Sequence, residues 1–139
     1  MSVKPNHSEN HQFENLIPGF DVQGMDLSLD RIAMALEDLG NPSKSIPAIQ
    51  IVGTNGKGST LSFIRNILIK NRHSCHAYTS PHLNRFNERI IINDQEITSA
   101  KLYDSLKYVK DINNNHPITF FEITTAAAFM LFAKHKADF

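Results

Sequence analysis

Residues 48–60 read Ala48-Ile-Gln-Ile-Val-Gly-Thr-Asn-Gly-Lys-Gly-Ser-Thr60, and this stretch decides which class of fold we expect. Residues 48–52 form a short apolar run with β-branched side chains, which predicts a buried strand. A glycine-rich turn follows at once, and residues 60–69 place leucine and isoleucine at helical spacing. Together with a second short strand at 75–79, these elements have the size of one βαβ unit. The stretch therefore predicts an α/β fold with a mostly parallel sheet and helices on both faces.

The turn between this strand and this helix has the residue types of a phosphate-binding loop. Glycines permit positive φ angles and let backbone N–H groups approach phosphate oxygens closely. The start of the helix adds exposed N–H donors and the positive end of its dipole. Lys57 supplies a positive charge, and Ser59 or Thr60 offers a hydroxyl for phosphate or Mg²⁺. The predicted nucleotide-binding set is Gly53, Thr54, Asn55, Gly56, Lys57, Gly58, Ser59 and Thr60.

The loop departs from the common P-loop pattern, G-x-x-x-x-G-K-[ST]. Counting back from Gly56, the first glycine of that pattern would fall on Ile51, and Gly58 follows the lysine. The alternative interpretation is a tight glycine turn with a serine cap and a merely solvated lysine. We favour phosphate binding because strand, turn, lysine and helix occur together.

The composition limits the partners of such a loop. The chain has 139 residues with 14 basic and 14 acidic side chains, so no global positive field exists to hold nucleic acid or a membrane. The longest apolar stretch, 126–133, is too short to span a bilayer, and the polar start lacks the apolar run of a signal peptide. The single cysteine, Cys75, cannot form an internal disulfide. We therefore expect a reducing, cytoplasmic setting with no membrane or nucleic acid partner.

The rest of the chain divides into an N-terminal arm and one predicted domain. Residues 1–24 are rich in polar residues and predict a loose arm with one packed turn, around Phe13, Leu16 and Ile17. The domain covers 25–139, and apolar residues at helical spacing between Met25 and Leu39 predict its first helix. Asp26 or Ser28 can cap the start of this helix, and Gly40 followed by Pro42 ends it.

Three more elements follow the predicted βαβ unit. Residues 89–93 predict a strand, with a turn at Asn93-Asp94 before Glu96-Ile97. A helix capped by Thr98 or Ser99 runs to the asparagines at 113–115, and a nearly apolar helix spans 119–135. Because an interior helix calls for a further strand, we expect the domain to be cut short at Phe139.

Four pieces of sequence resemble the folylpolyglutamate synthase and dihydrofolate synthase family, a branch of the Mur ligase superfamily. They are Leu39-Gly-Asn-Pro42, Ile51-Val-Gly-Thr-Asn-Gly-Lys-Gly-Ser-Thr60, Thr79-Ser-Pro-His-Leu83 with Arg85-Phe-Asn-Glu-Arg-Ile90, and Thr119-Phe-Phe-Glu-Ile-Thr-Thr125. Their order and spacing also match, over roughly residues 25–139. The first and third pieces favour the folate branch, because wall-building Mur ligases usually lack them.

The resemblance implies an ATP-dependent amide-bond ligase of the Mur type. Such an enzyme would add L-glutamate to dihydropteroate, to tetrahydrofolate or to both, through an acyl phosphate, with ATP and Mg²⁺. The partners would be these small molecules, and the complete protein would be a monomer.

The resemblance also assigns roles to residues. The loop from Gly53 to Ser59 would bind the ATP phosphates, and Ser80 would ligate Mg²⁺ together with a glutamate beyond the chain end. The family's loop over pterin and ATP matches Pro81, His82, Arg85, Phe86 and Arg89. Each of these has a plainer interpretation, for instance an ion pair between Glu88 and Arg89. Glu122 is either an active-site carboxylate or a residue favoured by the helix dipole.

Two alternatives from other classes stay open at this point. The chain could be a non-catalytic nucleotide-binding module, or part of a Mur-type or cyanophycin-type ligase with a non-folate substrate. In the favoured interpretation it is an N-terminal fragment that ends before the acidic metal-binding strand. We therefore expect the 139-residue chain alone to have no ligase turnover.

Overall fold

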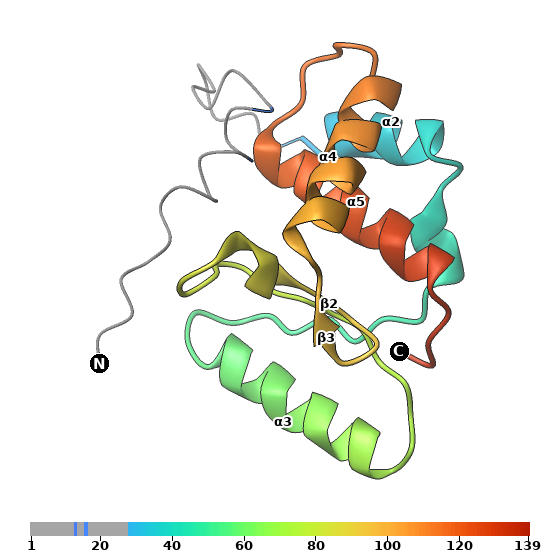
Figure 1. Cartoon of the computed structure of the whole chain (residues 1–139). Helices are drawn as coiled ribbons and strands as arrows, with labels where there is room; N and C mark the ends of the chain where they lie inside the picture. Colours follow the sequence, from blue (N-terminus) through green and yellow to red (C-terminus); the bar gives the residue numbers. More distant parts are fainter. Residues whose placement is uncertain (1–12, 14–15, 17–27) are drawn as a thin grey trace.

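The computed structural model describes residues 13, 16 and 28–139 (Figure 1). Its elements are α2 (Asp30–Asp38), the 3₁₀ helix η1 (Pro42–Ser45), α3 (Lys57–Lys70), β1 (Ala77–Tyr78), the 3₁₀ helix η2 (Phe86–Arg89), β2 (Ile90–Ile92), β3 (Gln95–Glu96), α4 (Ser99–Ile112) and α5 (Phe120–Lys134). The small sheet lies between α3 on one side and the packed helices α2, α4 and α5 on the other (Figure 1). Helices on both faces of a sheet were expected and are present.

The three strands form an antiparallel sheet in the order β1-β2-β3. Ala77 pairs with Ile91 across β1 and β2, and Ile92 pairs with Gln95 across β2 and β3. Asn93 and Asp94 join β2 to β3 with φ angles of 47° and 70°. Two successive left-handed residues make a tight hairpin turn that follows the twist of the strands. The turn predicted at Asn93-Asp94 is confirmed.

The predicted strand at 48–52 is wrong for the described part of the chain, where it has no strand pairing. The mostly parallel sheet that depended on it is likewise not present among the described residues. Ile49 is 51% exposed and Val52 is 82% exposed, so the run is not enclosed. An apolar run specifies burial, but a strand also needs neighbours for its N–H and C=O groups.

One backbone pairing does follow the parallel pattern. The Phe139 N–H donates to the Ser74 carbonyl at 3.2 Å, and the His76 N–H donates to the Phe139 carbonyl at 2.9 Å. Phe139 lies opposite Cys75 and bonds to both neighbours of that residue, Ser74 and His76. This is the hydrogen-bond pattern between two parallel strands. Phe139 therefore lies parallel to the segment that leads into β1.

The core lies between the sheet, α4 and α5. Its largest fully buried side chains are Phe13, Ile90, Leu102, Leu106, Ile123, Val109 and Thr124. Phe13 and Leu16 belong to this core, and the Leu16 N–H donates to the Phe13 carbonyl at 3.3 Å. The packed turn expected there is confirmed for these two residues. Ile17 and the rest of the arm over 1–24 lie outside the described residues.

The helices begin and end close to the predicted positions. Leu29 is the N-cap of α2, so Ser28 is not, and Asp26 lies outside the described residues. Gly40, with φ of 79°, follows α2, as expected for a stop signal. Thr98 caps α4 by accepting the Lys101 N–H at 3.3 Å. Within the described residues, no helix is both long and apolar enough to cross a bilayer.

Candidate functional site

The glycine loop is shaped by a left-handed residue at the start of α3. Gly56 is the N-cap of this helix, with φ of 77° and ψ of 0°, a conformation that strains any residue with a Cβ. A Cβ at Gly56 or Gly58 would meet nothing within 4 Å. Backbone conformation therefore selects glycine at position 56, and open space adjoins the loop at both positions.

The start of α3 offers backbone donors to a ligand. The first helical hydrogen bond runs from the Thr60 N–H to the Gly56 carbonyl at 2.9 Å, and no side chain caps the helix. The N–H groups before that bond have no acceptor within the helix. Because these donors coincide with the positive end of the helix dipole, the position suits an anion.

Lys57 turns its ammonium back onto the loop. Its Nζ donates to the Gly53 carbonyl at 2.7 Å and to the Thr54 carbonyl at 3.1 Å. The lysine is therefore not merely solvated, and its charge stands beside the open helix start. A polyphosphate would meet backbone donors and one mobile cation at the same place.

Ser80 lies two residues after the end of β1 and is exposed. The Thr79 N–H donates to the Arg89 carbonyl at 2.9 Å, which holds the two ends of the 80–88 segment together. The peptide bond from Ser80 to Pro81 is cis. This segment and the glycine loop lie at the same end of the sheet (Figure 1).

Arg89 and His82 pair with each other over an aromatic ring. The Arg89 Nε donates to His82 Nδ1 at 2.9 Å, and the guanidinium carbon lies 5.0 Å from the centroid of the Phe86 ring. Because Nδ1 accepts this bond, the neutral ring of His82 carries its proton on Nε2. The plainer interpretation of Arg89, an ion pair with Glu88, does not describe these contacts: Arg89 binds His82 and lies over Phe86.

Phe86 belongs to the core of the described structure, and its role in lining a ring-binding site stays a prediction. Its side chain is 4% exposed, and its ring centroid lies 4.9 Å from Phe120 and 5.4 Å from Phe13. An aromatic side chain in the sequence pattern F-N-E-R-I suits either role, and here burial decides. Phe86 therefore supports Arg89 and His82 from below.

Arg85 and Glu122 each have a carboxylate or guanidinium partner from another element. Arg85 Nη2 donates to Glu96 Oε2 at 2.6 Å on the surface. Glu122 Oε2 accepts the Thr119 N–H at 2.7 Å in a capping box, and the Arg31 Nε reaches its two oxygens at 3.2 and 3.3 Å. In the described structure Glu122 thus caps α5 and joins it to α2.

Tyr78 was not predicted to matter and joins β1 to α5. Its hydroxyl lies 3.0 Å from Thr125 Oγ1. Burial raises the pKa of the Tyr78 phenol, against the opposing effects of the Thr125 hydrogen bond and the Arg89 charge. A tyrosine in a two-residue strand gives no sequence signal for this contact, because its partner lies on a distant helix.

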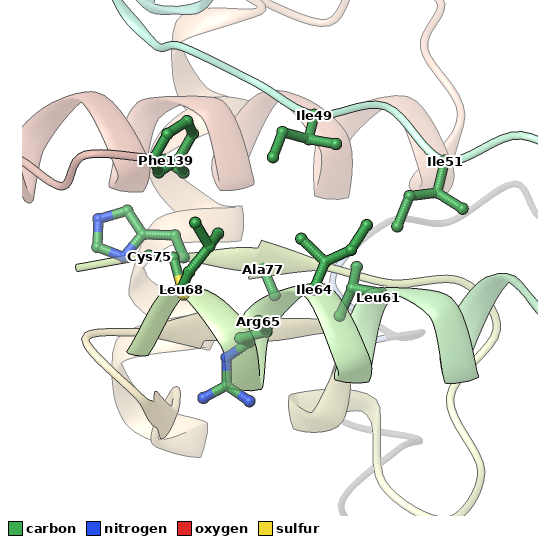
Figure 2. Close-up of a pocket in the computed structure, with 10 residues that line it drawn as sticks. Ile49, Ile51, Leu61, Ile64, Arg65, Leu68, Cys75, Ala77 and Phe139 are labelled. Carbon is green, nitrogen blue, oxygen red and sulfur yellow. The ribbon is translucent and has the colours of Figure 1, made fainter. Parts of the chain in front are cut away.

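A narrow apolar cavity of about 70 Å³ lies between α3, the 49–51 segment and β1 (Figure 2). Leu61, Ile64 and Leu68 of α3 face Ile49 and Ile51 across it, while the Arg65 side chain extends away to pair with Asp94 (Figure 2). Its size and apolar lining do not suit a nucleotide. The cavity is packing space beneath the glycine loop.

Glu122→Gln should lower the free energy of unfolding by about 1–3 kcal/mol, because hydrogen bonds to a partly buried charged group are lost. The change removes the charge with which Arg31 pairs and one acceptor of the capping box. Urea denaturation followed by circular dichroism measures it. Asp111→Asn, in the exposed pair with Lys107, serves as the control and should change little. Equal stability of Glu122→Gln and wild type would contradict the structural role.

Comparison with known proteins places the chain in a family. No model of a protein family matches the sequence. The dihydrofolate synthase/folylpolyglutamate synthase of Bacillus subtilis is 39% identical over 124 residues, which is 84% of this chain and 29% of that protein. The Haemophilus influenzae protein of the same name is 37% identical over 116 residues, 82% of this chain and 26% of that protein.

Solved structures agree over nearly the whole chain. FolC of E. coli in complex with DHPP and ADP has a TM-score of 0.82 at 28% identity, covering 98% of this chain and 32% of that chain. Folylpolyglutamate synthase of Thermotoga maritima has a TM-score of 0.80 at 33% identity, covering 95% of this chain and 32% of that one. The chain thus spans less than a third of the length of these relatives. By sequence and by structure it belongs to the folylpolyglutamate synthase and dihydrofolate synthase family.

Proposed function

We propose that this chain supplies the ATP-phosphate loop of a ligase that joins L-glutamate to dihydropteroate, tetrahydrofolate or both. The observation that carries the proposal is Lys57, whose ammonium lies over a glycine loop at the uncapped start of α3. Amide formation from a carboxylate in water needs activation, and phosphoryl transfer from ATP to the carboxylate provides it as an acyl phosphate. Holding several negative charges together is then the main task of the loop.

Related structures with bound ligands support the choice of ligands. FolC of E. coli is described with DHPP and ADP, and the Yersinia pestis enzyme with AMPPNP and an Mn ion. A further structure of the bifunctional synthase is described with Mn, AMPPNP and L-glutamate. We extend these ligand classes to the present chain, with Gly53 to Thr60 around the phosphates.

We assign Mg²⁺ to Ser80 as one of its ligands. A hydroxyl oxygen is a hard donor of the kind Mg²⁺ prefers, and Ser80 is exposed. The 80–88 segment to which it belongs lies at the same end of the sheet as the glycine loop (Figure 1). The described residues hold no cluster of three or more His, Cys, Asp or Glu, so phosphate oxygens and a further glutamate would complete the shell. When bound, the ion would neutralise phosphate charge.

We further propose that residues 25–139 are the first part of a Mur-type ATP-binding domain. In the longer protein the 48–52 run would join a parallel sheet, and the parallel bridge at Phe139 is the described contact that supports this. Pro81, His82, Arg85 and Arg89 would face the substrate, whose negative charge the two arginines would attract. Phe86 would hold them in place from the core.

Titration of the chain with Mg·AMP-PNP tests the nucleotide site. Calorimetry should show one saturable site from which ADP displaces the analogue. A folded chain that binds neither nucleotide at millimolar concentration would contradict the phosphate-loop assignment. Glutamate-dependent phosphate release should be absent for the 139 residues alone, since they span under a third of the relatives.

The substrate class is tested on a full-length ligase that contains these residues. It should release phosphate only when glutamate and either dihydropteroate or tetrahydrofolate are both present. Turnover with a peptidoglycan precursor instead would identify a ligase of another branch. Nucleotide binding without any turnover would identify a non-catalytic module.

Glu96→Gln should raise the affinity for dihydropteroate by up to about fivefold, because an exposed ion pair that competes for Arg85 is removed. In the present structure Arg85 must leave Glu96 before it can meet a ligand anion. Fluorescence titration with dihydropteroate measures the change, and Arg85→Gln should lower the affinity. Unchanged affinity in both variants would mean that Arg85 stays outside the ligand site.

A further inference from the structure

The Glu88 carboxylate accepts hydrogen bonds from three successive backbone N–H groups in the segment 82–89. Glu88 Oε2 accepts the Leu83 N–H at 2.8 Å, and Oε1 accepts the Arg85 N–H at 3.0 Å. The Asn84 N–H lies between them, at 3.2 and 3.3 Å from the two oxygens. Both oxygens are therefore engaged by consecutive amides.

Those amides belong to residues with little packing of their own. Leu83 is 90% exposed, and Asn84 and Arg85 are exposed as well. A segment without buried side chains owes its order to hydrogen bonds, since fixing each residue costs conformational entropy. Glu88 supplies three such bonds, each assisted by its charge.

The residues before Glu88 in η2 are packed into the core. Its neighbours Phe86 and Asn87 in η2 are 4% and 6% exposed. The Asn87 side-chain amide donates to the Ile97 carbonyl at 2.7 Å and lies 3.2 Å from Ser99 Oγ. The carboxylate thus links an exposed loop to the core and to the start of α4.

The conformation so held presents the side chains assigned to the substrate. Arg85 follows directly on the three fixed amides, and His82 precedes them. The charge state of Glu88 fits this role: desolvation tends to raise the pKa of its carboxyl, but the backbone bonds from 83–85 and the Arg85 charge lower the pKa overall. The carboxylate is therefore ionised at neutral pH.

We propose that Glu88 is a positioning residue, which fixes the backbone of Leu83 to Arg85 and thereby presents the segment to its pteroate-type ligand. The fixing of the backbone stands on the geometry above. The ligand half rests on the proposed function. Glu88 need not touch the ligand, because both of its oxygens are occupied by the loop.

The backbone half is tested by NMR on the ¹⁵N-labelled chain. The amide signals of residues 83–85 should titrate together as the pH falls below the ordinary carboxyl pKa of 4.5, because protonation removes the negative charge and turns one of the two acceptor oxygens into an O–H group. The sign follows from the lowered pKa: the bonds are complete above the ordinary value and are lost as pH falls through the lower one. Arg85 is the charged side chain that faces the carboxylate.

Glu88→Gln should abolish this shared titration and shift all three signals at neutral pH, whereas Glu88→Asp keeps the charge and should restore part of the effect. Glu37→Gln, an exposed carboxylate on α2, is the matched control and should leave the three signals unchanged. Unchanged α4 signals establish that each variant is folded. If the amide signals of residues 83–85 are the same in Glu88→Gln as in wild type, the proposal is overturned.

The ligand half is tested by two affinities on the same variants. Glu88→Gln should weaken dihydropteroate binding about tenfold while Mg·AMP-PNP binding changes less than about twofold, because the glycine loop is untouched. Equal dihydropteroate affinity in wild type and Glu88→Gln would overturn the positioning role. If wild type shows the Glu88-dependent signals but binds no dihydropteroate, the proposed function fails together with the ligand half.

Discussion

Lys57→Met is expected to weaken Mg·AMP-PNP binding by at least about 100-fold, the largest effect of any single change in the loop. The ammonium is the only side-chain cation that the described structure directs onto the loop carbonyls. Two charge-assisted hydrogen bonds to phosphate, at about 1.5–3 kcal/mol each, account for a loss of that size. Methionine keeps the length and helix propensity of lysine, so α3 should persist.

The matched control is Lys70→Met in the last turn of the same helix, which removes the same charge at the opposite end. Calorimetric titration should find its nucleotide affinity within about twofold of wild type, because exposed charges that far away are screened. Lys57→Arg should not restore binding, since a planar fork does not replace a compact ammonium. If Lys57→Met binds Mg·AMP-PNP as tightly as wild type, the loop is a tight glycine turn without a phosphate-binding role for the lysine.

Phe86→Ala is expected to lower the free energy of unfolding by about 3–5 kcal/mol, the typical result of deleting a buried aromatic ring. The ring packs against Phe13 and Phe120 and carries the Arg89 guanidinium on its face. Since small domains are stable by about 5–15 kcal/mol, such a loss populates the unfolded chain. Urea denaturation monitored by circular dichroism provides the measurement.

Two variants make the Phe86 result specific. Phe86→Leu should cost less than about 1.5 kcal/mol if neighbouring side chains close the smaller gap. Leu83→Ala, only three residues away but 90% exposed, should stay within about 0.5 kcal/mol of wild type. A loss under 1 kcal/mol for Phe86→Ala would mean that the ring is not a member of the core.

Local sequence signals predicted the parts of the fold that depend on local structure. Threonine at position 98 marked the start of α4, because a side-chain oxygen satisfies one of the first free N–H groups. Asn93-Asp94 marked the hairpin, since asparagine and aspartate tolerate the left-handed region. These features need no knowledge of distant residues.

Distant partners account for what the sequence did not predict. The 48–52 run has the composition of a buried strand, but its own residues do not determine which strand would pair with it. The antiparallel order of β1 and β2 follows from the return of the chain through η2, which a βαβ pattern does not foresee. Composition and period specify an element, whereas pairing requires the whole arrangement.

The candidate site divides in the same way. The glycine loop was predicted from seven consecutive residues, and its role stays a prediction. By contrast, the ion pair of Arg31 with Glu122 joins residues 91 positions apart. The packing of Phe86 against Phe13 and Phe120 likewise joins residues that are far apart in the sequence. Side chains with more than one plausible partner are resolved only by tertiary contacts.

The burial of Phe13 has a consequence for the order of events at the ribosome. It lies against Phe86 of η2, and the Lys110 ammonium of α4 donates to the Leu16 carbonyl across 94 positions of sequence. At translation rates of about 5–20 residues per second, Phe13 therefore emerges roughly 4–20 seconds before these partners. During that interval its aromatic side chain is open to nascent-chain chaperones, and the exposure ends only after η2 and α4 have been synthesised.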